Sequence, residues 1–389
     1  MEKNLRIAVA AERSSAYGRN FICGVAEVAE KHAEWNLTLI DPSQVAGKVA
    51  DGYDGWICRV ADVRTANALA RCGCPVVDCL CAVPTPRFAT VRTDAAAIGR
   101  LAAEHLLRRQ FPNLAFCGYR RIAFSDRRRD AFADALACNG IRPAVYRPPL
   151  ERNSRFGRDF LLGDRVESPP DAAALAKWLN RLPKPVGVFC CDDLRASQLL
   201  AACRALRLSV PDDVAILGVD NDPIYCTFSS PRLSSIDPDS VLIGQTAADT
   251  LARMLAGSEP ARPDRAVPPK GVVARASTDM YPAAPPWFAE ALAFIRENAV
   301  KGISAADVFR HVGFSRTLVE RAFRATISSS VQRQIADARI EEAKRLLSST
   351  PLPVKEIARL AGFSTLEYLS RVFAAATGLS PTAWRERTT

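Results

Sequence analysis

The feature that most constrains this chain is a repeated turn in its C-terminal part. Gly313-Phe314-Ser315 recurs as Gly362-Phe363-Ser364, and positions 313 and 362 lie 49 residues apart. An amphipathic segment precedes each copy, at 304–311 and 354–360, and we expect Ser315 and Ser364 to cap the helices that follow. The glycine supplies the tight turn between the two helices. Such a repeat predicts two helix–turn–helix motifs in one all-α domain.

Helix–turn–helix motifs suggest DNA binding, because the second helix of each pair can lie in a major groove with its N-terminal residues against the base edges. One such turn occurs in many helical bundles, whereas two copies joined by a helix over 332–350 are far more specific. That helix, roughly 17 residues and about 25 Å long, can hold two recognition helices about one DNA turn apart. Residues 287–389 carry 15 Lys and Arg against 10 Asp and Glu, which is compatible with an anionic partner.

Within this domain the sequence resembles the AraC family of transcription regulators. The resemblance rests on four motifs: Arg339-x3-Ala343-x2-Leu346-Leu347, Ile357-Ala358-x3-Gly362-Phe363, Leu369-x-Arg371-x-Phe373 and Thr377-Gly378-x-Ser380-Pro381. It implies base-reading positions on two helices: Arg316, Thr317, Glu320 and Arg321 on the first, and Leu366, Glu367, Ser370 and Arg371 on the second. Arg371 is the strongest single candidate, since a guanidinium can bond a guanine edge at two points.

Two departures from the family pattern bear on affinity. Ala374-Ala375-Ala376 stands where the family usually has basic residues, and the first motif lacks the glycine expected near Ser328. Both departures imply fewer phosphate contacts for one chain. We therefore expect a homodimer to be needed for tight binding to an operator in double-stranded DNA.

The preceding part of the chain alternates short apolar runs with amphipathic helical segments, which predicts an α/β fold with parallel strands. The expected strands are 6–10, 37–40, 55–57, 75–77, 114–117, 186–190 and 214–219, and 94–108 is an expected helix. The proline-rich run that begins at Tyr281 can continue neither a helix nor a central strand. We therefore expect a domain over 1–281, a linker over 282–286 and an all-α domain over 287–389.

Composition limits the class of protein. The 389 residues are 48% hydrophobic and 24% charged, with a net charge of +10, and no run is long and apolar enough to span a membrane. The first residues lack the pattern of a secretory signal, so we expect a cytoplasmic protein. The cluster Cys72, Cys74, Cys79 and Cys81 favours buried thiols over a metal site, because Cys-x-Cys places both side chains on one face of a strand. We expect neither a metal nor a cofactor.

Catalytic motifs are absent from the sequence, which contains no GxSxG, P-loop, HExxH or early GxGxxG pattern. We therefore expect a protein that is not an enzyme. Two alternatives remain: a sugar-modifying enzyme with a helical appendage, and a binding protein for a transporter. The paired helix–turn–helix motifs oppose the second.

Two segments resemble the sugar-sensing domain of the LacI/GalR family: VRTDAAAIGRLAAEHLL at 91–107 and LSVPDDVAILGVDND at 208–222. The resemblance implies a two-lobed, periplasmic-binding-protein-like sensor that closes on a small ligand at the carboxyl ends of its strands. It assigns the ligand contacts to Tyr17, Arg19, Phe124, Arg128, Asp192 and Asp220. Carboxylates accept from sugar hydroxyls, arginine donates to sugar oxygens, and an aromatic ring covers the apolar face. Alternatively, the aspartates are turn residues and Arg128 is surface charge.

The two resemblances together imply a sugar-responsive, sequence-specific DNA-binding transcription regulator. The expected effector is xylose or a related sugar, and the expected output is activation of sugar-catabolic genes. An activator would also have RNA polymerase as a partner. A membrane is not an expected partner.

Overall fold

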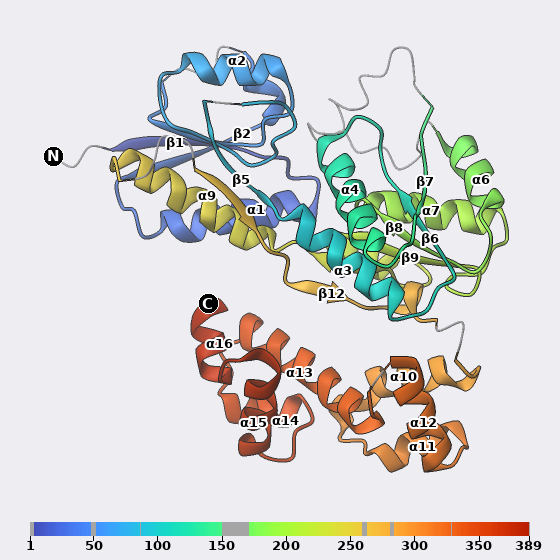
Figure 1. Ribbon diagram of the computed structural model, residues 1–389. Coiled ribbons are helices and arrows are strands. Elements are labelled where there is room, and N and C mark those ends of the chain that lie inside the picture. The colour runs from blue at the N-terminus through green and yellow to red at the C-terminus, as the bar shows by residue number, and fades with distance from the viewer. Residues whose placement is uncertain are drawn as a thin grey trace. The chain divides into compact units, whose positions relative to one another are not determined.

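The computed structural model describes residues 4–47, 52–85, 87–149, 171–258, 263–280, 284–327 and 329–388 (Figure 1). The chain divides into two compact units, an N-terminal unit of Met1–Leu107 with Phe111–Thr278 and a C-terminal unit of Arg108–Gln110 with Asp279–Thr389. The expected linker over 282–286 stays a prediction, because residues 281–283 lie outside the described residues.

The N-terminal unit contains two six-stranded sheets, one in each of two lobes. The first sheet is parallel throughout and has the order β11 (Asp264–Val267), β5 (Ala89–Thr93), β4 (Val76–Asp78), β3 (Gly55–Cys58), β1 (Leu5–Ala10), β2 (Trp35–Ile40). The second has the order β12 (Gly271–Val273), β10 (Ser234–Asp237), β9 (Val214–Val219), β8 (Val186–Cys190), β6 (Asn113–Cys117), β7 (Ala144–Val145). Only the β10–β12 pairing in this second sheet is antiparallel.

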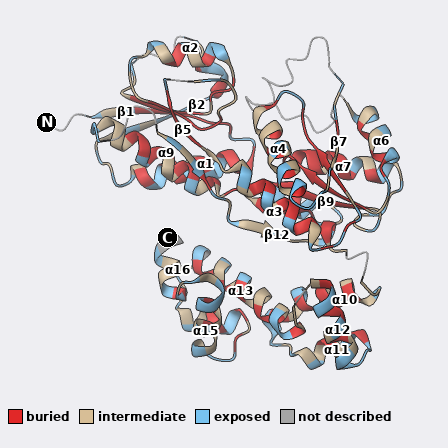
Figure 2. Cartoon of the chain, in the orientation of Figure 1, coloured by how far each residue is buried: buried red, intermediate tan, exposed pale blue. Residues whose placement is uncertain are grey.

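Helices cover both sheets and leave the central strands buried (Figure 2). The first lobe carries α1 (Ala16–Ala29), α2 (Val63–Arg71) and α9 (Ser240–Leu255), and the second carries α3 (Ala95–Leu107), α4 (Ala123–Ala137), α6 (Ala172–Arg181), α7 (Asp193–Ala205) and α8 (Pro223–Phe228). Every residue of β8 and β9 is buried, as expected for parallel strands covered on both faces. The chain crosses between the lobes after β5, after β10 and after β11, so three segments join them.

Two glycines allow α1 and α9 to pack closely. A Cβ on Gly24 would lie 2.0 Å from Val241 O, and a Cβ on Gly244 would lie 2.1 Å from Phe21 O. Each helix therefore places a glycine against the backbone of the other. This contact positions the N-terminus of α1, which follows β1 at the carboxyl edge of the first sheet.

The described residues of the C-terminal unit form helices joined by short turns, without a strand. Its helices are α10 (Trp287–Asn298), η4 (Ala299–Lys301), α11 (Ala305–Val312), α12 (Arg316–Ile327), α13 (Val331–Ser349), α14 (Val354–Leu360), α15 (Leu366–Thr377) and α16 (Pro381–Thr388). Two apolar cores lie along α13: Val331 and Ile335 pack into the first, while Ile340 and Leu347 pack into the second. This arrangement confirms the predicted fold class of a two-lobed α/β unit followed by an all-α double helix–turn–helix unit.

Most predicted elements lie where the apolar pattern placed them. Strands 186–190 and 214–219 match β8 and β9 residue for residue, and the helix expected at 94–108 is α3. The placement of the Cys-x-Cys pairs on a strand was wrong, because Cys72 is the C-cap of α2, Cys74 precedes β4, and Cys79 and Cys81 follow it. All four clustered cysteines are free thiols, of which Cys79 is buried.

The described residues contain neither a cluster of metal ligands nor a membrane-spanning helix. Within them, no group of three or more His, Cys, Asp or Glu side chains is arranged to hold a metal ion. None of the helices in this part of the chain combines the length and the apolar character that a membrane span requires.

Candidate effector site and nucleic-acid interface

The first lobe contributes a buried cluster of Glu12, Tyr17 and Arg59. Glu12 follows β1 and Arg59 follows β3, and these two strands pair in parallel. Arg59 forms an ion pair with Glu12 and lies 4.7 Å from the centre of the Tyr17 ring. Ser15 Oγ donates to Glu12 Oε1 at 3.1 Å, whereas Glu12 Oε2 is buried and has no hydrogen-bond partner among the described residues. That oxygen can accept a hydrogen bond from a ligand hydroxyl.

The second lobe contributes Arg128, which is 3% exposed on α4. Its guanidinium carbon lies 5.2 Å from the centre of the Phe124 ring, and its Nη1 donates to Cys191 O. Its Nη2 lies 3.7 Å from Asp220 Oδ1. Asp220 follows β9 with a φ of 110°, a conformation that is uncommon for a residue with a side chain. Arg128 is therefore a buried side chain held between an aromatic ring and a carboxylate, which rules out the reading as surface charge.

Asp192 has a structural role and an unused oxygen. Its Oδ1 accepts from Arg195 N at 2.7 Å and so caps α7, and Tyr119 Oη lies 3.4 Å from the same atom. Its Oδ2 is buried without a hydrogen-bond partner in the described part of the chain. The alternative reading of Asp192 as a turn residue therefore holds for one carboxylate oxygen, while the other can bind a ligand.

The clusters of the two lobes face each other across the N-terminal unit. Burial, together with the charge of Asp220, raises the pKa of the Tyr17 phenol, and Arg128 acts in the opposite direction. Two sets of hydrogen bonds join the lobes nearby: Ala16 N donates to Asp222 Oδ2 at 2.9 Å, and Arg127 donates to Cys81 O at 3.0 Å and to Leu80 O at 3.1 Å. A small ligand bound here would contact both lobes.

The structure brings together five of the six predicted effector contacts. Tyr17, Phe124, Arg128, Asp192 and Asp220 converge, whereas Arg19 is exposed and its Nη1 donates to Arg13 O at 2.9 Å. Sequence reasoning missed Glu12, Arg59 and Tyr119. Each of them lies within two residues of the end of a strand, which is where ligands bind in parallel α/β sheets.

The first helix–turn–helix motif consists of α11 and α12. A capping box of Ser304 and Asp307 begins α11, and Gly313, with a φ of +74°, ends it. Helix α12 buries Val319 and Phe323 in the first core. Its outer face lines a hollow of about 790 Å³, formed by Arg316, Thr317, Glu320, Arg321, Arg324, Ala325, Ser330 and Gln332. All four base-reading positions predicted on this helix therefore share one surface, and Arg324 adds an arginine that the sequence analysis did not name.

The second motif repeats this geometry with a shifted cap. Gly362 makes the turn after α14 with a φ of +80°. The prediction of Ser364 as N-cap was wrong, because Thr365 caps α15 and its Oγ1 accepts from Tyr368 N at 3.1 Å. Of the four positions predicted on α15, two are exposed (Glu367, Arg371) and two are partly exposed (Leu366, Ser370). The Arg371 guanidinium lies 5.5 Å from the centre of the Tyr368 ring.

Comparisons with known proteins agree with this division. Residues 103–278 match the model of a periplasmic binding protein-like domain, and residues 308–387 match a helix-turn-helix domain. The chain is 28% identical to the xylose operon regulatory protein of Escherichia coli K12, over 99% of this chain and 97% of that protein. It is 37% identical to the arabinose operon regulatory protein of the same organism, over 25% of this chain and 33% of that protein.

A solved structure matches along the full length. It is that of a xylose-binding transcription activator, which is 28% identical to this chain. The alignment covers 100% of both chains and has a TM-score of 0.61. Two of these proteins regulate operons and the third is a transcription activator. The chain is therefore similar along its whole length to xylose operon regulatory proteins, with a periplasmic-binding-protein-like domain followed by a helix–turn–helix domain.

Proposed function

We propose that this chain is a cytoplasmic, sugar-responsive transcription regulator that binds xylose or a related sugar and activates sugar-catabolic genes. We propose further that it binds its operator as a homodimer, contacts RNA polymerase when it activates, and has no catalytic role. The observation that carries the proposal is the set of buried polar atoms between the lobes that lack partners, in a chain with two exposed recognition helices. Those atoms are Glu12 Oε2, Arg128 Nε and Asp192 Oδ2.

The chemistry of the inter-lobe cluster suits a sugar. A buried polar atom without a partner costs about 1–3 kcal/mol, and a ligand hydroxyl can recover that cost. Glu12 and Asp192 offer acceptors from opposite lobes, and Arg128 offers a donor beside the Phe124 ring. A ligand with several adjacent hydroxyls and an apolar ring face would use all of them.

The inter-lobe hydrogen bonds supply a route from effector to output. The bonds of Arg127 and Ala16 form only while the lobes are close together, so a sugar that contacts both lobes favours that arrangement. In a homodimer, a change in lobe closure would alter the DNA affinity of the paired C-terminal units.

Thermal-shift measurements with xylose, other pentoses and hexoses test the effector site. We expect a sugar at a hundred times its dissociation constant to stabilise the folded protein by about 2.7 kcal/mol. Asp192→Asn should abolish the shift. The matched control is Asp62→Asn, because Asp62 caps α2 in the same way and has no buried oxygen without a partner. Equal shifts in both variants would show that Asp192 does not contact the sugar.

Mobility-shift assays with the chain's own promoter region, with and without the effective sugar, test the output. Sequence-specific binding that changes with sugar supports the proposal, and its absence under both conditions would refute it. The alternative of a sugar-modifying enzyme predicts chemical turnover of the bound sugar, which chromatography of the ligand after incubation would detect.

A further inference from the structure

The turn of the second helix–turn–helix motif packs against the backbone of the segment that precedes the first motif. A Cβ placed on Gly362 would lie 2.8 Å from Ala299 O, from Val300 Cα and from Val300 O. These atoms belong to η4, the short helix between α10 and α11, whose Ala299 packs into the first core. A side chain at position 362 would push the two motifs apart, so this contact requires glycine.

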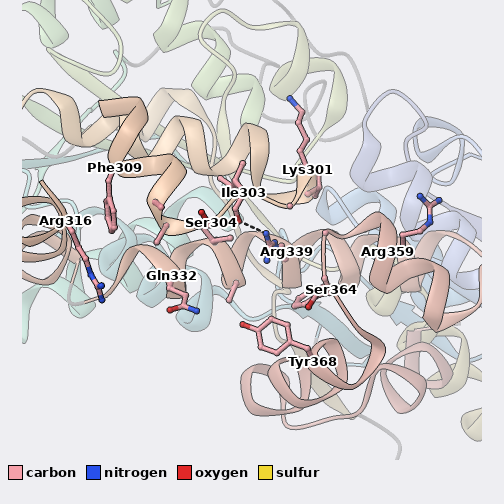
Figure 3. Close-up of a pocket in the computed structure, with 18 of the residues that line it drawn as sticks. Lys301, Ile303, Ser304, Phe309, Arg316, Gln332, Arg339, Arg359, Ser364 and Tyr368 are labelled. Carbon is pink, nitrogen blue, oxygen red and sulfur yellow. Dashed lines mark hydrogen bonds between the residues drawn. The ribbon is translucent and has the colours of Figure 1, made fainter. Parts of the chain in front are cut away.

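Arg339 binds the same segment from the connecting helix. Its Nε donates to Ala299 O at 2.9 Å and its Nη2 donates to Ile303 O at 2.8 Å (Figure 3). Burial lowers the pKa of Arg339, while Tyr368 of the second motif acts in the opposite direction. The guanidinium therefore binds the backbone that precedes α11, and it lines the same groove as Tyr368 of the second motif.

Arg339 lies at the point where α13 passes from the first apolar core to the second. Ile335 packs into the first core and Ile340 into the second, so Arg339 lies in the turn that joins them. A groove of about 1070 Å³ separates the motifs around it, with Ser304 and Arg316 on one side and Ser364 and Tyr368 on the other (Figure 3).

We propose that Arg339 and Gly362 are positioning residues that fix the angle between α12 and α15, and thereby the spacing of the two DNA boxes that one chain can bind. This inference rests on the proposed function. Neither residue needs to contact DNA. They hold α12 and α15 in a fixed relative orientation before DNA binds, so that binding does not carry the free-energy cost of ordering the two helices.

Spacing tolerance is the property that this proposal changes. The probe is a duplex selected from a random-sequence library by the full-length protein, with its two boxes located by footprinting; we call it the selected duplex. Each base pair inserted between the boxes rotates one box relative to the other by about 35°. For the unmodified protein we expect a loss of about tenfold in affinity per one or two inserted base pairs, equivalent to about 1.4 kcal/mol.

Arg339→Met is the first variant, and Arg345→Met is its matched control. Arg345 lies on the same helix, is exposed and pairs with Glu342 at 2.6 Å. We expect Arg339→Met to bind the selected duplex more weakly and to lose the spacing preference, so that affinities across the series agree within about threefold. Arg345→Met should keep the preference. An Arg339→Met protein that discriminates between spacings as the unmodified protein does would overturn the inference.

The paired glycines supply a second test that does not depend on Arg339. Gly313 and Gly362 occupy the same turn position with φ of +74° and +80°, but a Cβ on Gly313 would meet nothing within 4 Å. Alanine therefore strains both turns alike, and only Gly362→Ala pushes against the other motif. We expect Gly362→Ala alone to shift the preferred spacing. Equal behaviour of the two variants would contradict the inference, whereas a full-length protein that selects no duplex would refute the proposed function as well.

Discussion

Helix α12 of the first motif exposes three arginines, whereas α15 of the second exposes Arg371 and three consecutive alanines. Both helices follow a glycine turn of nearly the same φ and bury an equivalent phenylalanine, Phe323 or Phe373. The two motifs therefore share the glycine turn and the buried phenylalanine but differ in the charge of their exposed side chains. We infer that the first motif supplies most of the electrostatic affinity for DNA, while the second depends on a single arginine.

Removal of charge from α12 should have the largest effect on DNA binding. For the triple variant Arg316→Gln, Arg321→Gln and Arg324→Gln, we expect affinity for the selected duplex to fall on the order of a hundredfold at 0.15 M salt. Each lost phosphate contact should also reduce the slope of log K against log salt by about 0.9. Fluorescence anisotropy over a salt series measures both quantities.

A control for this triple variant removes the same charge elsewhere. Arg64, Arg71 and Arg100 are exposed on helices of the N-terminal unit, and their replacement by Gln should leave the salt slope nearly unchanged. If the control lowers affinity as much as the α12 variant, then net charge matters and the surface of α12 does not.

Arg371→Ala should have the second largest effect and a different character. The guanidinium is held over the Tyr368 ring, which favours a fixed orientation against a base edge. We expect a cost of about 1–3 kcal/mol together with relaxed preference at one base position, as measured by repeating the selection with the variant. Arg371→Lys keeps the charge but not the paired donors, so it should also relax the preference. Full rescue by lysine would assign Arg371 to a phosphate instead.

Adding a positive charge to α15 tests the difference between the two motifs in the opposite way from removing charge on α12. Ala375 is exposed and lies one helical turn after Arg371, on the same face. We expect Ala375→Lys to raise affinity by roughly fivefold at 0.15 M salt, for the selected duplex and for unrelated duplexes alike. Ala375→Glu should lower it. No response to either change would mean that this part of α15 lies away from the DNA backbone.

The sequence predicted the sheets best where burial alone determines the pattern. β8 and β9 are buried on both faces, so each appears as an uninterrupted apolar run. β10 was missed because Ser234 and Ser235 occupy buried positions. The side-chain hydroxyl of Ser234 is satisfied by a specific partner, since its Oγ donates to Arg275 O at 2.9 Å. β7 has two residues and β12 has three, which is too short for any periodicity to show.

The effector cluster was harder to predict because its members meet only through the fold. Glu12 and Arg59 are far apart in the chain and become neighbours because β1 and β3 pair in parallel. Residue type alone does not distinguish Arg19, which is exposed, from Arg128, which is buried beside Asp220. Distance from the end of a strand identifies Glu12, Arg59 and Tyr119, but it does not identify Arg128, which lies farther along the chain from β6 than Arg19 lies from β1.

The smallest expected effect concerns the N-caps of α12 and α15. The sequence repeat aligns Ser315 with Ser364, but the residue that caps α15 is the next one, Thr365. Ser315 Oγ accepts from Leu318 N at a long 3.4 Å, whereas Thr365, the residue after Ser364, forms the cap of α15 at 3.1 Å. We expect Thr365→Ala to cost about 1 kcal/mol of local stability and Ser315→Ala about half of that. Hydrogen exchange of the first-turn amides of α12 and α15 measures the two costs separately. Ser364→Ala is the matched control and should leave the exchange of the α15 amides unchanged. Faster exchange in that variant would show that Ser364, and not Thr365, caps α15.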